Sequence, residues 1–125
     1  MKLTPILFVP RIEPALPFWT EKLGFTKTVE VPEGDHLGFV ILVKDSIEVM
    51  MQTRQSIAED MPTVAAEASS AFLFIEESDF DGVLKMVEGL EVIVPVRTTF
   101  YGMKEIGVKD PSGNLLCFAV PMAPQ

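Results

Sequence analysis

The chain has 125 residues, 48% of them hydrophobic, and a formal net charge of −8. This length suits one compact domain, and the apolar content is too high for a disordered chain. The excess of acidic over basic residues repels phosphate backbones, so we expect no nucleic-acid partner. The same charge would attract a cationic small molecule, although acidity also serves solubility alone.

The apolar segments and the cysteine and histidine content exclude further classes. No run of eighteen apolar residues occurs, so we expect no membrane-spanning helix. The apolar N-terminal segment is interrupted by prolines and lacks a small-residue cleavage site, which argues against a signal peptide and for a cytoplasmic protein. A single cysteine, Cys117, excludes an intramolecular disulfide, and a single histidine, His36, excludes a histidine cluster as a metal site.

The first half of the chain predicts a strand, a helix and three further strands. The first strand covers residues 3–9, and the later strands cover residues 25–31, 37–43 and 47–52. The helix spans about residues 13–23, with Pro14 in its first turn and Gly24 as a left-handed cap. Trp19 lies at helical spacing from Leu16 and Leu23, so we expect it in the core.

The second half repeats this order after a polar, alanine-rich segment. Residues 53–69 contain Pro62 and are typical of a linker, which divides the chain into modules at residues 1–52 and 70–121. Strands are predicted at 71–75, 90–96, 104–108 and 115–120, and a helix begins at the N-cap Ser78 and ends at Gly89. Each module therefore has the order βαβββ, and neither could bury its sheet alone, so we expect one domain.

A shift of 65 residues relates the two halves. It superposes Gly24 on Gly89 and Ile41 on Ile106, and it places the tripeptide Val-Lys-Asp at 43–45 on the same tripeptide at 108–110. Beyond that tripeptide the second half carries about four extra residues, a turn-forming insertion. These matches in one register predict an internal duplication.

Two motifs and the paired modules resemble a known family. The motifs are Pro-Phe-Trp-Thr-Glu-Lys-Leu-Gly-Phe at 17–25 and Lys-Asp-Pro-Ser-Gly-Asn at 109–114. They look like the vicinal oxygen chelate superfamily, which includes glyoxalases, extradiol dioxygenases, fosfomycin resistance enzymes and bleomycin resistance proteins. The resemblance implies an α+β fold in which two βαβββ modules form a curved mixed sheet around a cleft.

The resemblance also implies where metal ligands of such proteins would lie. These slots fall near Thr4, Glu48, Ser70 and Cys117, where metal-dependent members usually have His, Gln or Glu. Divalent metals need several strong donors at one point. One carboxylate, one thiol and two hydroxyls form a poor shell, so we expect no metal and no other cofactor.

Among the branches, the chain looks most similar to the bleomycin resistance proteins, which are metal-free, acidic and dimeric. Lys-Leu-Thr-Pro at 2–5 resembles their N-terminal arm, where a proline hooks the first strand onto the partner subunit, although the first loop here is shorter. The resemblance implies a homodimer that binds a cationic antibiotic without breaking a bond. Pairing of two copies would also cover open sheet edges.

Six residues are candidate ligand contacts: Phe39, Glu48, Met50, Phe72, Phe74 and Tyr101. Phe39 and Tyr101 match, by the resemblance, a phenylalanine that lines the antibiotic cleft and a tryptophan that stacks on the ligand. Phe72 and Phe74 share one strand face, and Met50 shares one with Glu48. The alternatives are ordinary core for the two phenylalanines, loop packing for Tyr101, and a salt-bridged edge charge for Glu48.

The other reactive side chains have simpler interpretations. We expect Cys117 to be a small buried hydrophobe, because no activating base lies near it in sequence. His36 follows a glycine and an aspartate, and we expect it in an exposed loop. Glu48 could pair with a ligand cation, or act as a base with a raised pKa.

These observations favour a metal-free binding protein that sequesters a planar or cationic compound, such as a glycopeptide antibiotic, in an aromatic cleft. The first alternative is a metal-dependent, glyoxalase-like lyase, isomerase or dioxygenase that uses Glu48 in an atypical metal shell. The second is a protein that shares only the fold and binds a metabolite.

Overall fold

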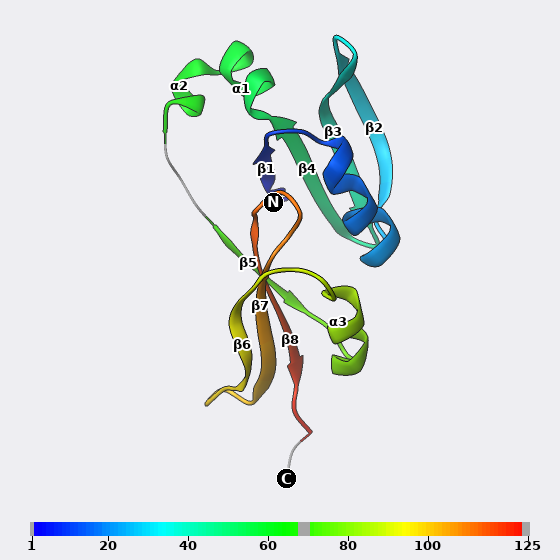
Figure 1. Ribbon diagram of the computed structural model, residues 1–125, viewed down its shortest axis with the longest axis vertical. Coiled ribbons are helices and arrows are strands. Elements are labelled where there is room, and N and C mark those ends of the chain that lie inside the picture. Colours follow the sequence, from blue (N-terminus) through cyan, green and yellow to red (C-terminus); the bar gives the residue numbers. More distant parts are fainter. Residues whose placement is uncertain (1, 68–70, 124–125) are drawn as a thin grey trace. The chain divides into compact units, whose positions relative to one another are not determined.

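The computed structural model divides into two compact units, Met1–Ser69 and Ser70–Gln125, and the structure describes residues 2–67 and 71–123. Each unit consists of one mixed four-stranded sheet and short helices (Figure 1). The predicted α+β fold of two βαβββ modules is confirmed. The packing of the modules as one domain around a cleft stays a prediction.

The first sheet has the strand order β1-β4-β3-β2. The strands are β1 (Ile6–Val9), β2 (Thr26–Glu33), β3 (His36–Lys44) and β4 (Ile47–Thr53). The short β1 runs parallel to β4, whereas β3 is antiparallel to both of its neighbours. The β1-to-β4 pairing places the N-terminal strand beside the strand that carries Glu48 and Met50.

The helical segment between β1 and β2 differs from the single α-helix predicted at 13–23. It contains a 3₁₀-helix η1 (Glu13–Ala15) and a π-helix η2 (Phe18–Lys22), closed by a bond from Leu23 N to Phe18 O (3.0 Å). Pro14 and Pro17 have no N–H to donate, so a continuous α-helical ladder cannot form through them. Gly24 then adopts φ +83°, as expected of a left-handed cap.

The segment predicted as a linker is partly helical. Thr53 ends β4, and two helices follow, α1 (Arg54–Asp60) and α2 (Pro62–Ala65). The Thr53 hydroxyl accepts a hydrogen bond from Ser56 N (3.0 Å), which caps α1, and α1 buries Ile57. This segment therefore continues the first unit beyond its sheet.

The second sheet repeats the topology with the order β5-β8-β7-β6. Its strands are β5 (Phe72–Glu76), β6 (Val92–Thr98), β7 (Met103–Lys109) and β8 (Leu115–Pro121). The helix α3 (Phe80–Met86) follows β5 and begins two residues after the predicted N-cap Ser78. Asp79 occupies the N-cap and makes no side-chain cap bond.

The duplication holds for topology, but the shift of 65 does not preserve the sheet faces. Ile41 pairs with Met50 on a half-buried face, whereas Ile106 pairs with Phe118 and both are buried. The last two strands are joined by two residues in the first unit and by five in the second, so three extra residues are present rather than four. A one-residue difference in register moves every side chain to the other face.

One face of each sheet packs against the helices of its own unit. In the first unit this face buries Val40, Leu42 and Met51, and Trp19 is buried as predicted. In the second unit it buries Phe118, and Lys104 Nζ lies 4.8 Å from the ring of Phe80 in α3, which marks the same side of the sheet. Each opposite face carries candidate site residues. No helix in the described ranges is long and apolar enough to span a membrane.

Candidate functional site

The helix-free face of the first sheet, here called the first open face, brings together three of the predicted residues. Glu48 and Met50 alternate along β4 with the buried Val49 and Met51, as predicted. Cross-strand pairing places Phe39 opposite Gln52, the next residue of β4 on this side. Lys44, on the other side, donates to Leu23 O (2.6 Å) at the end of the helical segment. Phe39, Glu48 and Met50 therefore face away from the helices.

Glu48 is engaged by the N-terminal residues of its own unit. Lys2 Nζ lies 3.0 Å from Oε2, and the Thr4 hydroxyl donates to Oε1 at 3.3 Å. Thr4 and Glu48, two of the slots implied by the resemblance, are thus adjacent. Glu48 is salt-bridged, as in the alternative interpretation, but on an inner strand rather than an edge.

The helix-free face of the second sheet, the second open face, carries two aromatic rings. Phe72 and Phe74 of β5 remain 52% and 55% exposed, so they are not ordinary core of this unit. Phe74 pairs with Cys117 of β8, which places the thiol on the same face. Two half-exposed rings at alternate positions of one strand form a continuous aromatic surface.

A buried carboxylate, Glu105, lies on this second open face. Its side chain is 2% exposed, and its Oε1 accepts from Arg97 Nε at 2.8 Å and lies 2.6 Å from Arg97 Nη2. Its Oε2 accepts from the Tyr101 hydroxyl at 2.8 Å. Burial alone would raise the pKa of Glu105, but the bonds from Arg97 and Tyr101 together outweigh it and lower that pKa.

The partners of Glu105 respond in the opposite sense. The hydrogen bond to Glu105 raises the pKa of Tyr101, because it favours the neutral phenol. The hydrogen bond that Arg97 donates to Glu105 likewise raises the pKa of Arg97. Tyr101 is thus half exposed but held by its hydroxyl, in a turn whose neighbouring Phe100 ring is fully exposed.

Cys117 is buried, as predicted for a small hydrophobe. Burial and the neighbouring Glu105 carboxylate raise the pKa of the thiol to about 11. The thiol is therefore protonated at neutral pH, and neither nucleophilic attack nor metal ligation is favoured at this site.

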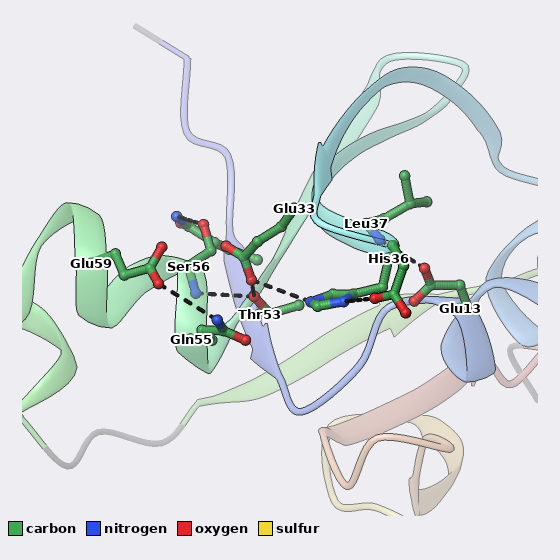
Figure 2. Close-up of polar contacts among 10 residues, drawn as sticks. Glu13, Glu33, His36, Leu37, Thr53, Gln55, Ser56 and Glu59 are labelled. Carbon is green, nitrogen blue, oxygen red and sulfur yellow. Dashed lines mark hydrogen bonds and ion pairs between the residues drawn. The ribbon is translucent and has the colours of Figure 1, made fainter.

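His36 does not lie in an exposed loop, and this prediction was wrong. It begins β3, and its ring nitrogens contact Asp35 Oδ1 at 3.1 Å and Glu33 Oε1 at 3.3 Å (Figure 2). Glu33 Oε1 also accepts from the Thr53 hydroxyl at 3.3 Å, which ties the hairpin to the start of α1. The contact with Asp35 raises the pKa of His36, with a smaller contribution from Glu33. The two-residue turn between β2 and β3 thus places the His36 ring against Glu33 at the end of β2.

The same hairpin is also tied to the helical segment. Leu37 N donates to Glu13 Oε2 at 2.7 Å, and this backbone bond lowers the pKa of Glu13 (Figure 2). Together with Glu33 and Thr53, Glu13 holds the β2–β3 hairpin from two sides. The cluster therefore ties this hairpin to the helical segment and to the end of β4.

The slot residues do not fit a metal site of the family type. Glu48 is already paired with a lysine, Thr4 offers only a hydroxyl, and Cys117 is a protonated thiol. Ser70 lies outside the described residues. Within the described ranges, no three His, Cys, Asp or Glu side chains are arranged to hold a metal ion. Divalent metals require stronger donors than these.

Two residues of the second open face, Arg97 and Glu105, were missed by the sequence reasoning. The available signal was a glutamate near the start of the strand predicted at 104–108, with an arginine directly after the strand predicted at 90–96. Because a carboxylate is rarely buried without a partner, this pattern indicates a cross-strand ion pair.

Comparisons with known proteins agree with this architecture. Residues 3–118 match the model of the Glyoxalase/Bleomycin resistance protein/Dioxygenase superfamily. No curated protein sequence matches. Solved structures with the same fold include a glyoxalase/bleomycin resistance protein/dioxygenase family enzyme from Burkholderia phytofirmans PsJN (16% identity, TM-score 0.78, covering 95% of this chain and 97% of that one).

Two further structures resemble the chain to a similar degree. TioX from Micromonospora sp. ML1 is 16% identical with a TM-score of 0.74 and covers 98% of this chain and 99% of its own. A glyoxalase/bleomycin resistance protein/dioxygenase from Nocardioides is 19% identical with a TM-score of 0.72 and covers 100% of this chain and 86% of its own. At such low sequence identities, the similarity shows a shared fold only. On the match of the family model, the chain belongs to the glyoxalase/bleomycin resistance protein/dioxygenase superfamily.

Proposed function

We propose that the protein binds a planar small molecule without a metal and without chemical conversion, the function implied by its resemblance to bleomycin resistance proteins. The observation that carries this proposal is the pair of half-exposed rings, Phe72 and Phe74, on the helix-free side of the second sheet. Exposed aromatic side chains held on a strand provide a preformed stacking surface at little cost in conformational entropy.

The side chains around these rings favour binding over catalysis. Glu105 is held by Arg97 and Tyr101, and Cys117 is a protonated, buried thiol. An activated nucleophile needs a lowered pKa or an adjacent free base, and none of these groups supplies one. Sequestration by stacking uses the same residues without a reacting group.

The first open face contributes its own contacts to the proposed function. Phe39 is a half-buried aromatic side chain, and Met50 is a half-buried, polarizable side chain that adapts to different ligand shapes. A cationic ligand bound at this face would displace Lys2 from Glu48, and the acidic chain favours the approach of such a ligand. A glycopeptide antibiotic with planar and cationic parts is the class that the resemblance suggests.

Isothermal titration with bleomycin and with the planar cation proflavine tests this proposal. We expect saturable heat for at least one of them, with weaker binding by Phe72→Ala and Phe74→Ala. Absence of heat for both compounds, up to millimolar concentration, would overturn binding of planar cations.

We further propose a homodimer. The strands β1, β2, β5 and β6 lie at sheet edges, and apolar side chains of β2 such as Val29 and Val31 are half exposed. Pairing of two copies would cover edges and apolar side chains of this kind. Light scattering is expected to give twice the chain mass at micromolar concentration, and a monomer would contradict the proposal.

The alternative is a metal-dependent enzyme of the same superfamily, and the observation that favours it is the Glu48 carboxylate beside Thr4. Elemental analysis of the purified protein separates the two functions. Stoichiometric nickel, zinc, iron or manganese that is lost in Glu48→Gln would favour the enzyme. Metal below a tenth of an equivalent would favour sequestration.

A further inference from the structure

The second open face is organised as two neighbouring rows of side chains across all four strands. In one row Phe74 of β5 pairs with Cys117 of β8, Cys117 with Gly107 of β7, and Gly107 with Val94 of β6. In the next row Glu76 of β5 pairs with Ala119 of β8, Ala119 with Glu105 of β7, and Glu105 with Arg97 of β6. Neighbouring strands lie about 4.8 Å apart, so the aromatic edge and the arginine edge are separated by roughly 14 Å of backbone.

The middle of this face carries small side chains. Gly107 has none, and a Cβ there would lie 2.8 Å from Val94 Cβ, so the Val94 side chain lies directly over it. Cys117 and Ala119 occupy the adjacent strand and are buried. The most exposed groups are therefore at the two sides, the rings of β5 with Glu76 on one and the Arg97 side chain on the other.

The charges on this face are Glu76 of β5, which is exposed beside the rings, Lys109 of β7, which pairs with Glu91, and Arg97 of β6 at the opposite edge. Glu105 is 2% exposed and both of its oxygens are engaged, whereas the Arg97 side chain is 58% exposed. Arg97 directs Nε and Nη2 toward Oε1 of Glu105. A guanidinium carries five N–H donors on two edges, so the ion pair fixes one edge and leaves the other directed away from the carboxylate.

We propose, on the basis of the proposed function, that the second open face binds a planar aromatic acid. Its ring system stacks on Phe74, and its carboxylate or sulfonate accepts hydrogen bonds from the outer edge of Arg97. Glu105 and Tyr101 are positioning residues, because Glu105 accepts hydrogen bonds from the guanidinium and Tyr101 holds Glu105. A guanidinium fork pairs with such planar or trigonal anions through two parallel hydrogen bonds.

The acidic net charge of the chain does not oppose this assignment strongly. Charges more than about 8 Å away are largely screened at physiological ionic strength. The contact with Arg97 is made at hydrogen-bond distance, where a charge-assisted bond dominates. Selectivity for the acid is thus a local property of β6 and β7.

The test uses two fluorescent probes that share one ring system and differ only in an acidic group. 8-Anilinonaphthalene-1-sulfonate carries a sulfonate, and N-phenyl-1-naphthylamine lacks it. The wild-type chain is expected to bind the sulfonate about tenfold more tightly, the effect of one charge-assisted contact. Arg97→Gln is expected to abolish this tenfold preference without weakening the neutral probe, whereas Phe74→Ala weakens both.

The matched control is Arg54→Gln, which removes the same charge from an exposed site at the start of α1. Circular dichroism establishes that each variant is folded. Arg97→Lys, which keeps the charge but loses the fork, provides a second variant and is expected to lose most of the preference.

The outcomes separate the inference from the function on which it rests. Equal binding of the two probes by the wild-type chain, or equal weakening of the sulfonate by Arg97→Gln and Arg54→Gln, would overturn the aromatic acid alone. If neither naphthyl probe nor proflavine binds, the proposed function itself fails.

Discussion

Truncation of Phe74 to alanine should separate ligand binding from folding. Phe74 is 55% exposed, so a little under half of its surface is buried in the free protein. A phenylalanine buries roughly 200 Å² when fully enclosed, so about 90 Å² is at stake here. At about 25 cal/mol per Å², this area corresponds to ~2 kcal/mol as an upper bound, and alanine retains part of it. We expect the free energy of unfolding to fall by about 1 kcal/mol.

Binding should suffer more than stability does. A stacked aromatic contributes about 1–3 kcal/mol to binding of a planar ring, which corresponds to roughly five- to hundredfold in Kd. Probe titration with N-phenyl-1-naphthylamine measures the loss, and urea unfolding measures the stability of the same sample. The variant should remain folded because small domains are stable by about 5–15 kcal/mol.

Phe118 is the matched control, since it is the same residue type on a neighbouring strand but faces α3. It is fully buried, so Phe118→Ala should lower the free energy of unfolding by about 3–5 kcal/mol. If Phe74→Ala destabilises the protein as much as Phe118→Ala does, the ring belongs to a buried core. Unchanged binding in a folded Phe74→Ala variant would refute its role in stacking.

Three further predictions concern groups outside the aromatic surface. Contacts with Asp35 and Glu33 raise the pKa of His36, so its contribution to the free energy of unfolding is complete below the unfolded pKa of about 6.5 and is lost as pH rises through the folded pKa. In urea unfolding, His36→Asn should therefore destabilise the protein at about pH 5.5 and much less at about pH 8.5. The reverse order would contradict this prediction. The pKa of about 11 at Cys117 predicts slow labelling of the folded chain by dithiobis-nitrobenzoate at pH 8 and fast labelling in denaturant. Rapid labelling of the folded chain would show an accessible thiolate and contradict this prediction. Gly89 has φ +83° and open space around the position of a Cβ, so a side chain there would strain only the backbone. Gly89→Ala should lower the free energy of unfolding by about 1 kcal/mol, and Gly89→Asn should lower it less. Equal stability of the alanine variant and the wild-type chain would refute the left-handed cap.

The strand pattern and its faces could be predicted from the sequence because they depend on neighbours along the chain. Alternation of polar and apolar residues predicted that Met50 faces away from Val49 and Met51, and Gly24 predicted a left-handed helix end. The weak donors at the metal slots were also evident, because ligand strength is a property of residue type.

The register of the sheets and the polar cluster were decided by tertiary structure. The shift of 65 that aligns the two halves does not align the faces of their inner strands, because Ile41 of β3 lies on a half-buried face and Ile106 of β7 on the buried one. Arg97 and Glu105 meet only because β6 and β7 pair in one particular register. Cross-strand partners are distant in sequence, and local pattern alone does not specify which residues will face each other.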